Sequence, residues 1–485
     1  RMRQFSRRTT ISSNGGLALD GFCNISNSAG APTTTTFESQ WGINSVFGLA
    51  SFGWGGWVYL DVSARNDWSS TLPEGNNSYF YPSASLSFVL SELPGLNKIG
   101  ALSFAKLRAS YAEVGNDASP YRLADVFSPQ VPNFDGNPRY AVPNSQNNPE
   151  LRPERTSEYE VGIDLRFFNR RIGLDVAYFD RTTEDQIFTV PSSAATGYTS
   201  RVLNAGEMRN WGWEFQLNLT PVLTDDFRWD IGVNAFRQNN EVVNLAEGVE
   251  AIQRGGTWAA DLRIAEGFPY MAVFGQDYLL NDNGERLVDE DGFYQFTPER
   301  VFLGSALADW TGGFSTALNW KGAFASVLFD WQEGGVIHST SLQWAKYSGM
   351  HPETVSFNGV EDIRADGGSL VLPGVKADGS PNDIRVDPQV YYQTFWNRAA
   401  PNVFEASFLK LREVRFGYTF PNSVFGNNTF RDMTISVFGR NLAILSADLP
   451  YLDPQIITGA GNDQGLENAQ VPSTRTWGVN LQFKF

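Results

Sequence analysis

The sequence predicts an all-β fold, an antiparallel transmembrane β-barrel, and three observations support this prediction. Aromatic residues make up 14% of the 485 residues, although hydrophobic residues in total reach only 42%. This mix is typical of a thin apolar band with aromatic girdles rather than a thick core. Segments in which apolar and polar side chains alternate recur along the whole chain. The last of them, residues 476–485, ends on the aromatic Phe485.

The two-residue period identifies the strands in chain order. Residues 45–60 predict a hairpin with its turn at Gly55-Gly56. Residues 159–167 and 172–178 predict a second hairpin around the short turn 168–171. The same period recurs in residues 58–65, 213–219, 229–235, 314–320, 414–420 and 433–437. We expect about fourteen to sixteen strands, many of about 8–11 residues, the length that a tilted strand needs to cross a membrane.

The connections between these strands come in two sizes. Some are tight, such as Lys321-Gly322, whereas others are long and irregular: residues 119–153, 246–268, 281–308 and 336–406. Short turns at one end and long loops at the other are typical of outer-membrane barrels, whose long loops face outward. We see no linker between domains, so residues 1–485 are expected to form a single architecture.

Charge and residue types exclude several functions. The net charge of −16 disfavours nucleic acid as a partner, since phosphate binding needs a basic surface. The single cysteine, Cys23, is expected to be an unpaired thiol, and His338 and His351 lack the spacing of metal ligands. Glu158 and Glu160 face the expected lumen, where charged residues are ordinary, so a paired-carboxylate hydrolase is rejected. We predict no catalytic residues and no enzyme.

The final strand carries the sharpest signal. Its apolar face consists of Trp477, Val479, Leu481, Phe483 and Phe485. An open sheet edge is intolerable in lipid, so a barrel must close through its terminal strand, and we assign that role to this segment.

Six motifs are spread over most of the chain. They are residues 65–70 with 81–88, 104–111 with 114–116, 148–156, 204–214, 408–418, and 439–442 with Asp453-Pro454. Each motif is weak alone, but together and in this order they resemble the C-terminal part of the barrel of one family, the SusC-like (SusC/RagA) TonB-linked outer-membrane transporters.

The resemblance implies a fold and a function. The complete barrel would have about 22 strands, with an N-terminal plug domain and early strands that are not visible in this chain. It implies import of oligosaccharides or oligopeptides, driven by the TonB complex acting through the missing N-terminal half. It also implies a SusD-like surface lipoprotein as partner, and an integral place in the outer membrane of a Gram-negative bacterium among lipid and lipopolysaccharide.

Two sets of loop residues are candidate sites. Aromatic side chains that could stack on sugar rings or pack on peptide side chains are Trp258, Trp344, Tyr391, Tyr392 and Trp396. The alternative is that they support the loops or lie in the interface girdle. Asp282, Asp289 and Asp291 supply oxygen donors of the kind calcium prefers, although the spacing departs from the EF-hand and two tight turns explain it as well. No other cofactor is expected.

Two further functions remain open from the sequence. A passive porin or structural barrel would fit if these strands closed by themselves. A secreted soluble glycan-binding β-protein would fit if the apolar faces were buried against each other.

Overall fold

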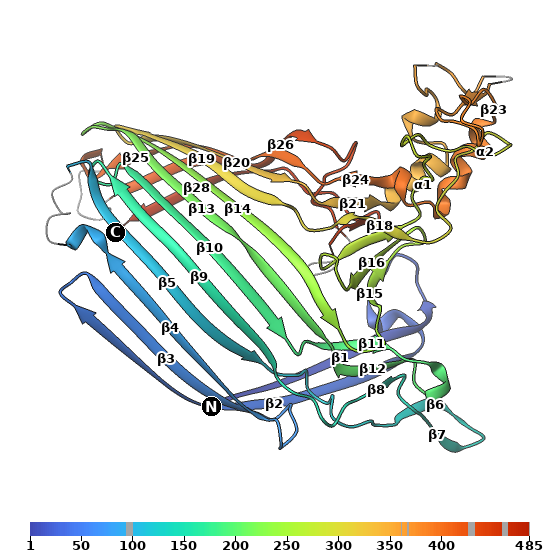
Figure 1. Cartoon of the computed structure of the whole chain (residues 1–485), viewed down its shortest axis with the longest axis horizontal. Helices are drawn as coiled ribbons and strands as arrows, with labels where there is room; N and C mark the ends of the chain where they lie inside the picture. Colours follow the sequence, from blue (N-terminus) through green and yellow to red (C-terminus); the bar gives the residue numbers. More distant parts are fainter. Residues whose placement is uncertain (94–99, 360, 366–367, 425–431, 458–463, 485) are drawn as a thin grey trace.

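The computed structural model describes residues 1–93, 100–359, 361–365, 368–424, 432–457 and 464–484 (Figure 1). Its dominant element is a 14-stranded antiparallel sheet in which each strand pairs with its neighbours in chain order. The strands are β1 (Met2–Leu17), β2 (Ser28–Trp54), β3 (Val58–Ser69), β4 (Ser78–Val89), β5 (Leu102–Asn116), β9 (Glu154–Phe167), β10 (Ile172–Glu184), β13 (Gly206–Leu223), β14 (Phe227–Leu245), β19 (Trp310–Trp320), β20 (Ala323–Glu333), β25 (Phe408–Pro421), β26 (Asp432–Ala447) and β28 (Thr476–Lys484).

The hairpin of β9 and β10 shows how the sequence sets the register. The pairing runs without a shift from Phe167 opposite Ile172 to Arg155 opposite Glu184. Residues 168–170 of the turn all have positive φ, which gives the backbone twist that a tight hairpin turn needs. Since side chains alternate between faces, this register places Tyr159 and Val161 on one face, where they are 61% and 57% exposed. The predicted hairpin is confirmed.

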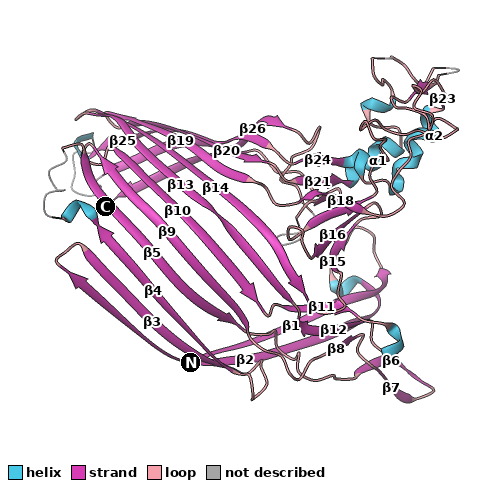
Figure 2. Cartoon of the chain, viewed as in Figure 1, coloured by secondary structure: helices cyan, strands magenta, loops and turns pink. Residues whose placement is uncertain are grey.

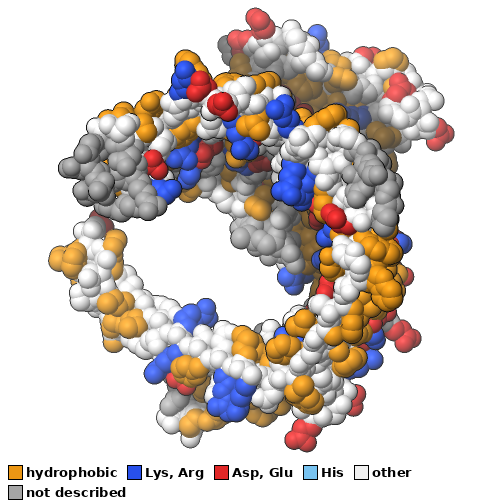
Figure 3. Space-filling model, turned by 90° about the vertical axis from the view of Figure 1, so that its left-hand side faces the viewer, with side chains coloured by type: hydrophobic (Ala, Val, Ile, Leu, Met, Phe, Trp, Pro, Cys, Tyr) orange, Lys and Arg blue, Asp and Glu red, His pale blue; other side chains and the backbone are white. Residues whose placement is uncertain are grey.

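The opposite face of the same strands is polar and charged. Arg108 on β5 donates to Glu160 on β9 at 3.0 Å and to Asp175 on β10 at 2.8 and 2.9 Å. The sheet curves around a wide hollow that this face lines, with basic and acidic side chains directed into it (Figure 3). An apolar outer face and a polar inner face are the arrangement of a barrel wall in lipid.

The two ends of the sheet differ strongly. Four of the connections at one end are tight turns: residues 55–57, 168–171, 224–226 and 321–322. Five of the connections at the other end are long: residues 117–153, 185–205, 246–309, 334–407 and 448–475. Among the described residues, the two α-helices and most of the small sheets gather at this second end, on the right of the views in Figures 1 and 2. The expected asymmetry is therefore present.

Two details of the expectation were wrong. Several strands are longer than about 11 residues, and β2, β13 and β14 have 27, 18 and 19 residues. The long connections are folded rather than irregular. They contain β6 (Ser128–Phe134), β7 (Asn137–Ala141), β8 (Ser145–Gln146), β11 (Ile187–Pro191), β12 (Ser200–Asn204), β15 (Ala251–Gly256), β16 (Ala260–Ala265), β17 (Ala272–Gly275), β18 (Val301–Ser305), β21 (Val336–Ser339), β22 (Leu370–Val371), β23 (Arg385–Val386), β24 (Val403–Glu405), β27 (Leu466–Glu467), α1 (Thr340–Tyr347) and α2 (Pro388–Gln393).

The terminal strand lies at an edge of the sheet. β28 pairs with β26 from Thr476 to Lys484, and among the described residues no strand pairs with its other side. β1 forms the opposite edge, so the two ends of the sheet are not joined to each other. Trp477 and Val479 are each 67% exposed on the outer face, as expected, whereas Phe485 falls outside the described residues.

Across the described part of the chain, no helix combines the length and apolar character needed to cross a bilayer.

Candidate functional site: the outer loops and the lumen wall

The connection between β14 and β19 and the connection between β20 and β25 build a compact unit at the long-loop end of the sheet, which we call the loop body (residues 246–309 and 334–407). Its helices begin where the sequence caps them: Ser339 accepts from the N–H of Leu342 at 3.1 Å, and Asp387 accepts from that of Val390 at 2.9 Å. Its largest core cluster comprises Val288, Tyr294, Ile363, Leu370, Leu372, Val386, Tyr391, Tyr392 and Phe395. A loop with such a core holds its surface residues in fixed positions.

The structure divides the five predicted aromatic contacts into two groups. Trp258, Trp344 and Trp396 are exposed, at 57%, 37% and 47%. Trp258 and Trp344 meet edge to face with ring centroids 5.7 Å apart, although 86 positions separate them in sequence. Tyr347 extends this pair, at 5.2 Å from Trp344. The sequence analysis missed Tyr347, although its spacing of three from Trp344 on a capped helix would have placed both on one face.

The other two aromatics lie inside the loop body. Tyr391 and Tyr392 are only 4% and 2% exposed, and their rings pack together and against Phe395. The hydroxyl of Tyr392 donates to the backbone oxygen of Glu353 at 2.8 Å. Burial raises the pKa of Tyr392, and the neighbouring Glu353 adds to the rise. This placement favours the interpretation that the two tyrosines support the loops.

The acidic segment forms two tight turns. The Oδ1 atom of Asn281 accepts from the N–H groups of Asn283 and Glu285, and that of Asp289 accepts from those of Asp291 and Phe293, all at 2.9–3.0 Å. Within the described ranges, no group of three His, Cys, Asp or Glu side chains is arranged to hold a metal ion. The geometry therefore favours turns over the predicted calcium site at Asp282, Asp289 and Asp291, and calcium stays a prediction.

The two glutamates considered for catalysis have ion-pair partners, and the two histidines and the cysteine are placed differently. Glu158 and Glu160 form ion pairs with Arg181 and Arg108 across neighbouring strands. His338 is fully buried on β21, and burial lowers its pKa to about 4. The Nδ1 atom of His351 accepts from the N–H of Glu353 at 3.2 Å and so caps a short 3-10 helix. Cys23 is a free, exposed thiol in the connection between β1 and β2.

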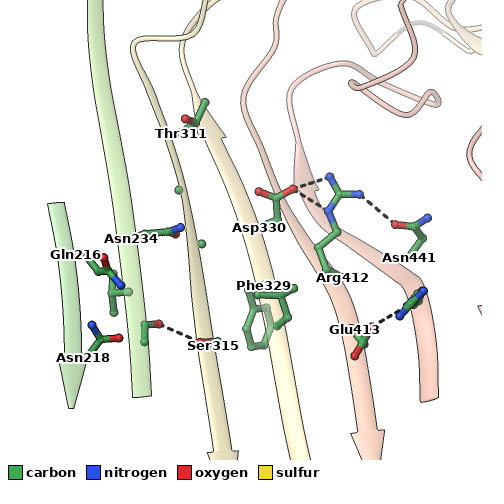
Figure 4. A pocket seen from close by; sticks show the side chains of 16 residues that line it. Gln216, Asn218, Asn234, Thr311, Ser315, Phe329, Asp330, Arg412, Glu413 and Asn441 are labelled. Carbon is green, nitrogen blue, oxygen red and sulfur yellow. Dashed lines mark hydrogen bonds and ion pairs between the residues drawn. The ribbon is translucent and has the colours of Figure 1, made fainter. Parts of the chain in front are cut away.

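A groove of about 710 Å³ is hollowed into the inner wall where β13, β14, β19, β20, β25 and β26 run side by side (Figure 4). Two glycines, Gly232 and Gly313, leave room for it, and a Cβ on Gly313 would lie 2.9 Å from Oδ1 of Asn234. Amide and hydroxyl side chains line its floor: Gln216, Asn218, Asn234, Thr311 and Ser315.

Charged side chains close one side of the groove. Arg412 donates to Asp330 at 2.5 and 2.7 Å and to Asn441 at 3.1 Å, and Arg440 donates to Glu413 at 2.7 Å (Figure 4). Arg412 and Glu413 can both face the lumen because the pairing of β25 with β26 shifts between Leu411 and Glu413. The sequence analysis missed this groove, since it depends on the register of six strands.

A curved sheet with an apolar outer face, a polar hollow and folded loops at one end defines the wall of an outer-membrane β-barrel. The comparisons agree with this class. A family model described as TonB dependent receptor-like, beta-barrel, matches residues 3–359. The chain therefore belongs to the TonB-dependent receptor β-barrel family.

Known relatives and structures are similar over most of the chain. It is 26% identical over 511 residues to TonB-dependent receptor P26 of Formosa agariphila, covering 96% of this chain and 48% of that receptor. It is 25% identical over 240 residues to TonB-dependent receptor SusC of Bacteroides thetaiotaomicron, covering 48% of this chain and 24% of SusC. The RagAB peptide importer in its closed-closed state has a similar fold, with a TM-score of 0.76 and 20% identity over 100% of this chain and 53% of that chain.

These findings confirm the resemblance, the fold class and the integral location in the bacterial outer membrane. They also confirm that the chain belongs to a family of receptors rather than enzymes. The alternative of a soluble secreted protein is wrong, because the apolar faces of the strands are exposed rather than buried against each other. The chain spans about half the length of the curated relatives P26 and P3 that it matches.

Proposed function

We propose that the chain is the C-terminal part of the barrel of a TonB-dependent importer that carries oligosaccharides or oligopeptides across the outer membrane. The single observation that carries this proposal is the family match over residues 3–359. The polar hollow supplies a path for hydrophilic solutes, and the loop body supplies a folded outer surface above it. Trp258, Trp344 and Trp396 are the exposed aromatics we propose as substrate contacts.

We propose the remaining components of the transporter from the same family. A plug domain and earlier strands would come from a longer protein, consistent with relatives of twice this length. Further strands would pair with the edges at β1 and β28 to complete the barrel, since an unpaired edge is costly in lipid. TonB would act on the plug, and a SusD-like surface lipoprotein would cover the loop body.

The sheet topology argues against the alternative of a passive porin. A self-closed barrel of this chain would pair β1 with β28, whereas these strands form the two separate edges of the sheet. That alternative therefore lacks a supporting contact among the described residues.

An intact-mass measurement on protein purified from detergent-solubilised membranes tests the proposal, together with a denaturing gel of the proteins that co-purify. We expect a polypeptide about twice as long as this chain, or a second fragment carrying the plug, accompanied by a surface lipoprotein. A lone species of 53.8 kDa would overturn the plugged importer and favour the passive barrel.

A further inference from the structure

A small cavity in the loop body is built around an arginine. It has a volume of about 320 Å³, and its lining includes Tyr278, Arg286, Tyr294, Lys346, Phe357 and Phe395. These residues come from segments up to 117 positions apart. Both polar groups and aromatic rings line this cavity, and its volume suits one ring.

Arg286 is held in place by aromatic rings. Its guanidinium carbon lies 3.9 Å from the ring centroid of Tyr278 and 5.3 Å from that of Tyr294. The backbone on either side is fixed, since Arg286 bridges to Leu280 across the Asn281–Gly284 turn and its carbonyl accepts from Val375 at 2.9 Å. Stacking and a hydrogen bond to Tyr294 restrict the guanidinium, and Arg286 is exposed, so the remaining N–H groups at its edge can reach an acceptor from solvent.

The arginine has no carboxylate partner. Throughout the described part of the chain, no acidic side chain forms an ion pair with Arg286, and its side-chain hydrogen bond goes to Tyr294. The lining also contains Lys346, whose side chain is 7% exposed and lies 3.2 Å from Glu353. With Glu353 balancing Lys346, the cavity keeps one positive charge, on Arg286, and so favours an anion.

The remaining groups favour a sugar as the carrier of that anion. Tyrosine hydroxyls, the amide of Asn358 and the carboxylate of Glu353 offer donors and acceptors in several directions. The ring of Phe357, which is half-buried, offers apolar surface for one face of a pyranose. A bidentate guanidinium contact is the strong recognition mode for a carboxylate.

We propose that this cavity binds a uronate unit of an acidic oligosaccharide, with Arg286 as the residue that recognises the carboxylate. The inference rests on the proposed import function and narrows its substrate class. Arg286 is then a specificity-determining residue of the loop body, separate from the aromatic surface at Trp258 and Trp344.

The test measures binding to the complete receptor, purified in detergent with its co-purifying partners, by isothermal calorimetry. The probes are short oligomers of galacturonate, glucuronate and mannuronate, the methyl esters of the same oligomers, and a tetra-alanine peptide with a free carboxyl terminus. We expect at least one uronate oligomer to bind and its methyl ester to bind at least about tenfold more weakly. Arg286→Gln should remove that difference in affinity. Arg286→Lys keeps the charge without the planar fork and should give an intermediate affinity.

The matched control is Arg385→Gln, which removes an arginine of the same loop body that donates to Ser369 at 3.0 Å. It should bind the uronate oligomer as the wild type does, and hydrogen exchange of the loop body should be equal in all variants. Four results would each overturn the proposal. They are uronate binding that Arg286→Gln does not change, equal binding of uronates and their esters, no uronate binding at all, and tighter binding of the peptide than of the uronates. TonB-dependent uptake of another solute by the same receptor would leave the proposed function standing in every one of these cases.

Discussion

Lys410→Met should release the connection 448–475 from the barrel wall. Lys410 on β25 and Asp453 in that connection form an ion pair whose side chains are 4% and 10% exposed. The ammonium also donates to Oε1 of Gln455 at 2.9 Å, and Ser473 donates to Asp453 at 2.5 Å. Removing one partner of a buried pair leaves an uncompensated charge and costs about 3–5 kcal/mol. At the lower bound, local opening of the connection becomes roughly a hundredfold more frequent.

Hydrogen exchange followed by mass spectrometry measures this opening directly. Peptides from residues 464–475 should exchange about a hundredfold faster in Lys410→Met, with peptides from β9 and β10 unchanged. Replacing Asp453 by Leu as well should restore part of the protection, because no buried charge then remains. The control is Lys321→Met, whose pair with Asp226 spans 3.3 Å between side chains 61% and 62% exposed and contributes little. The reasoning is refuted if Lys410→Met and Lys321→Met exchange alike.

Three other predictions use different parts of the molecule. Phe215→Arg on the outer face should destabilise the barrel by about 2–4 kcal/mol in urea unfolding from liposomes, whereas Gln216→Arg on the inner face should cost much less; equal losses would contradict the assignment of faces. The folded pKa of His338, about 4, lies below its ordinary 6.5, so the folded loop body binds fewer protons. Its stability should hold above pH 6.5 and fall as the pH drops from 6.5 towards 4. Once exchange rates are divided by the intrinsic rate at each pH, protection of the loop body should be lower at pH 5 than at pH 7 in the wild type but not in His338→Gln. Trp258→Ala should weaken binding of the imported ligand about tenfold, whereas Tyr392→Phe should leave it unchanged; the reverse order would show that the buried tyrosine is the contact.

The strands could be predicted because their environment is local and repetitive. Lipid outside and water inside act on every second residue, so Val161 and Glu160 reveal their faces from sequence alone. The turn at Gly55-Gly56 and the terminal strand followed from the same rule. Strand length was underestimated, as β2 shows by extending from Ser28 to Trp54. The reason is that a period of two does not show where the membrane ends and the solvent begins.

The loop body and the groove could not be predicted because their contacts are non-local. Tyr391 and Trp258 look equivalent in sequence, yet one is 4% and the other 57% exposed, since burial depends on packing between distant segments. The groove needs Gly313 on β19 to face Asn234 on β14, a relation set by sheet register. Asp289, in contrast, belongs to a local feature, and a tight turn was one of the two alternatives that the sequence suggested for it. The structure shows its carboxylate accepting from two backbone N–H groups of that turn.

The central claim, energy-coupled import through this barrel, is tested most directly by uptake of a labelled oligosaccharide into intact cells before and after collapse of the proton-motive force. The full-length receptor should give uptake that stops when the force is collapsed, and that is absent from cells lacking either the receptor or TonB. Receptor-dependent uptake that continues at the same rate without the force would contradict the account and identify a passive pore.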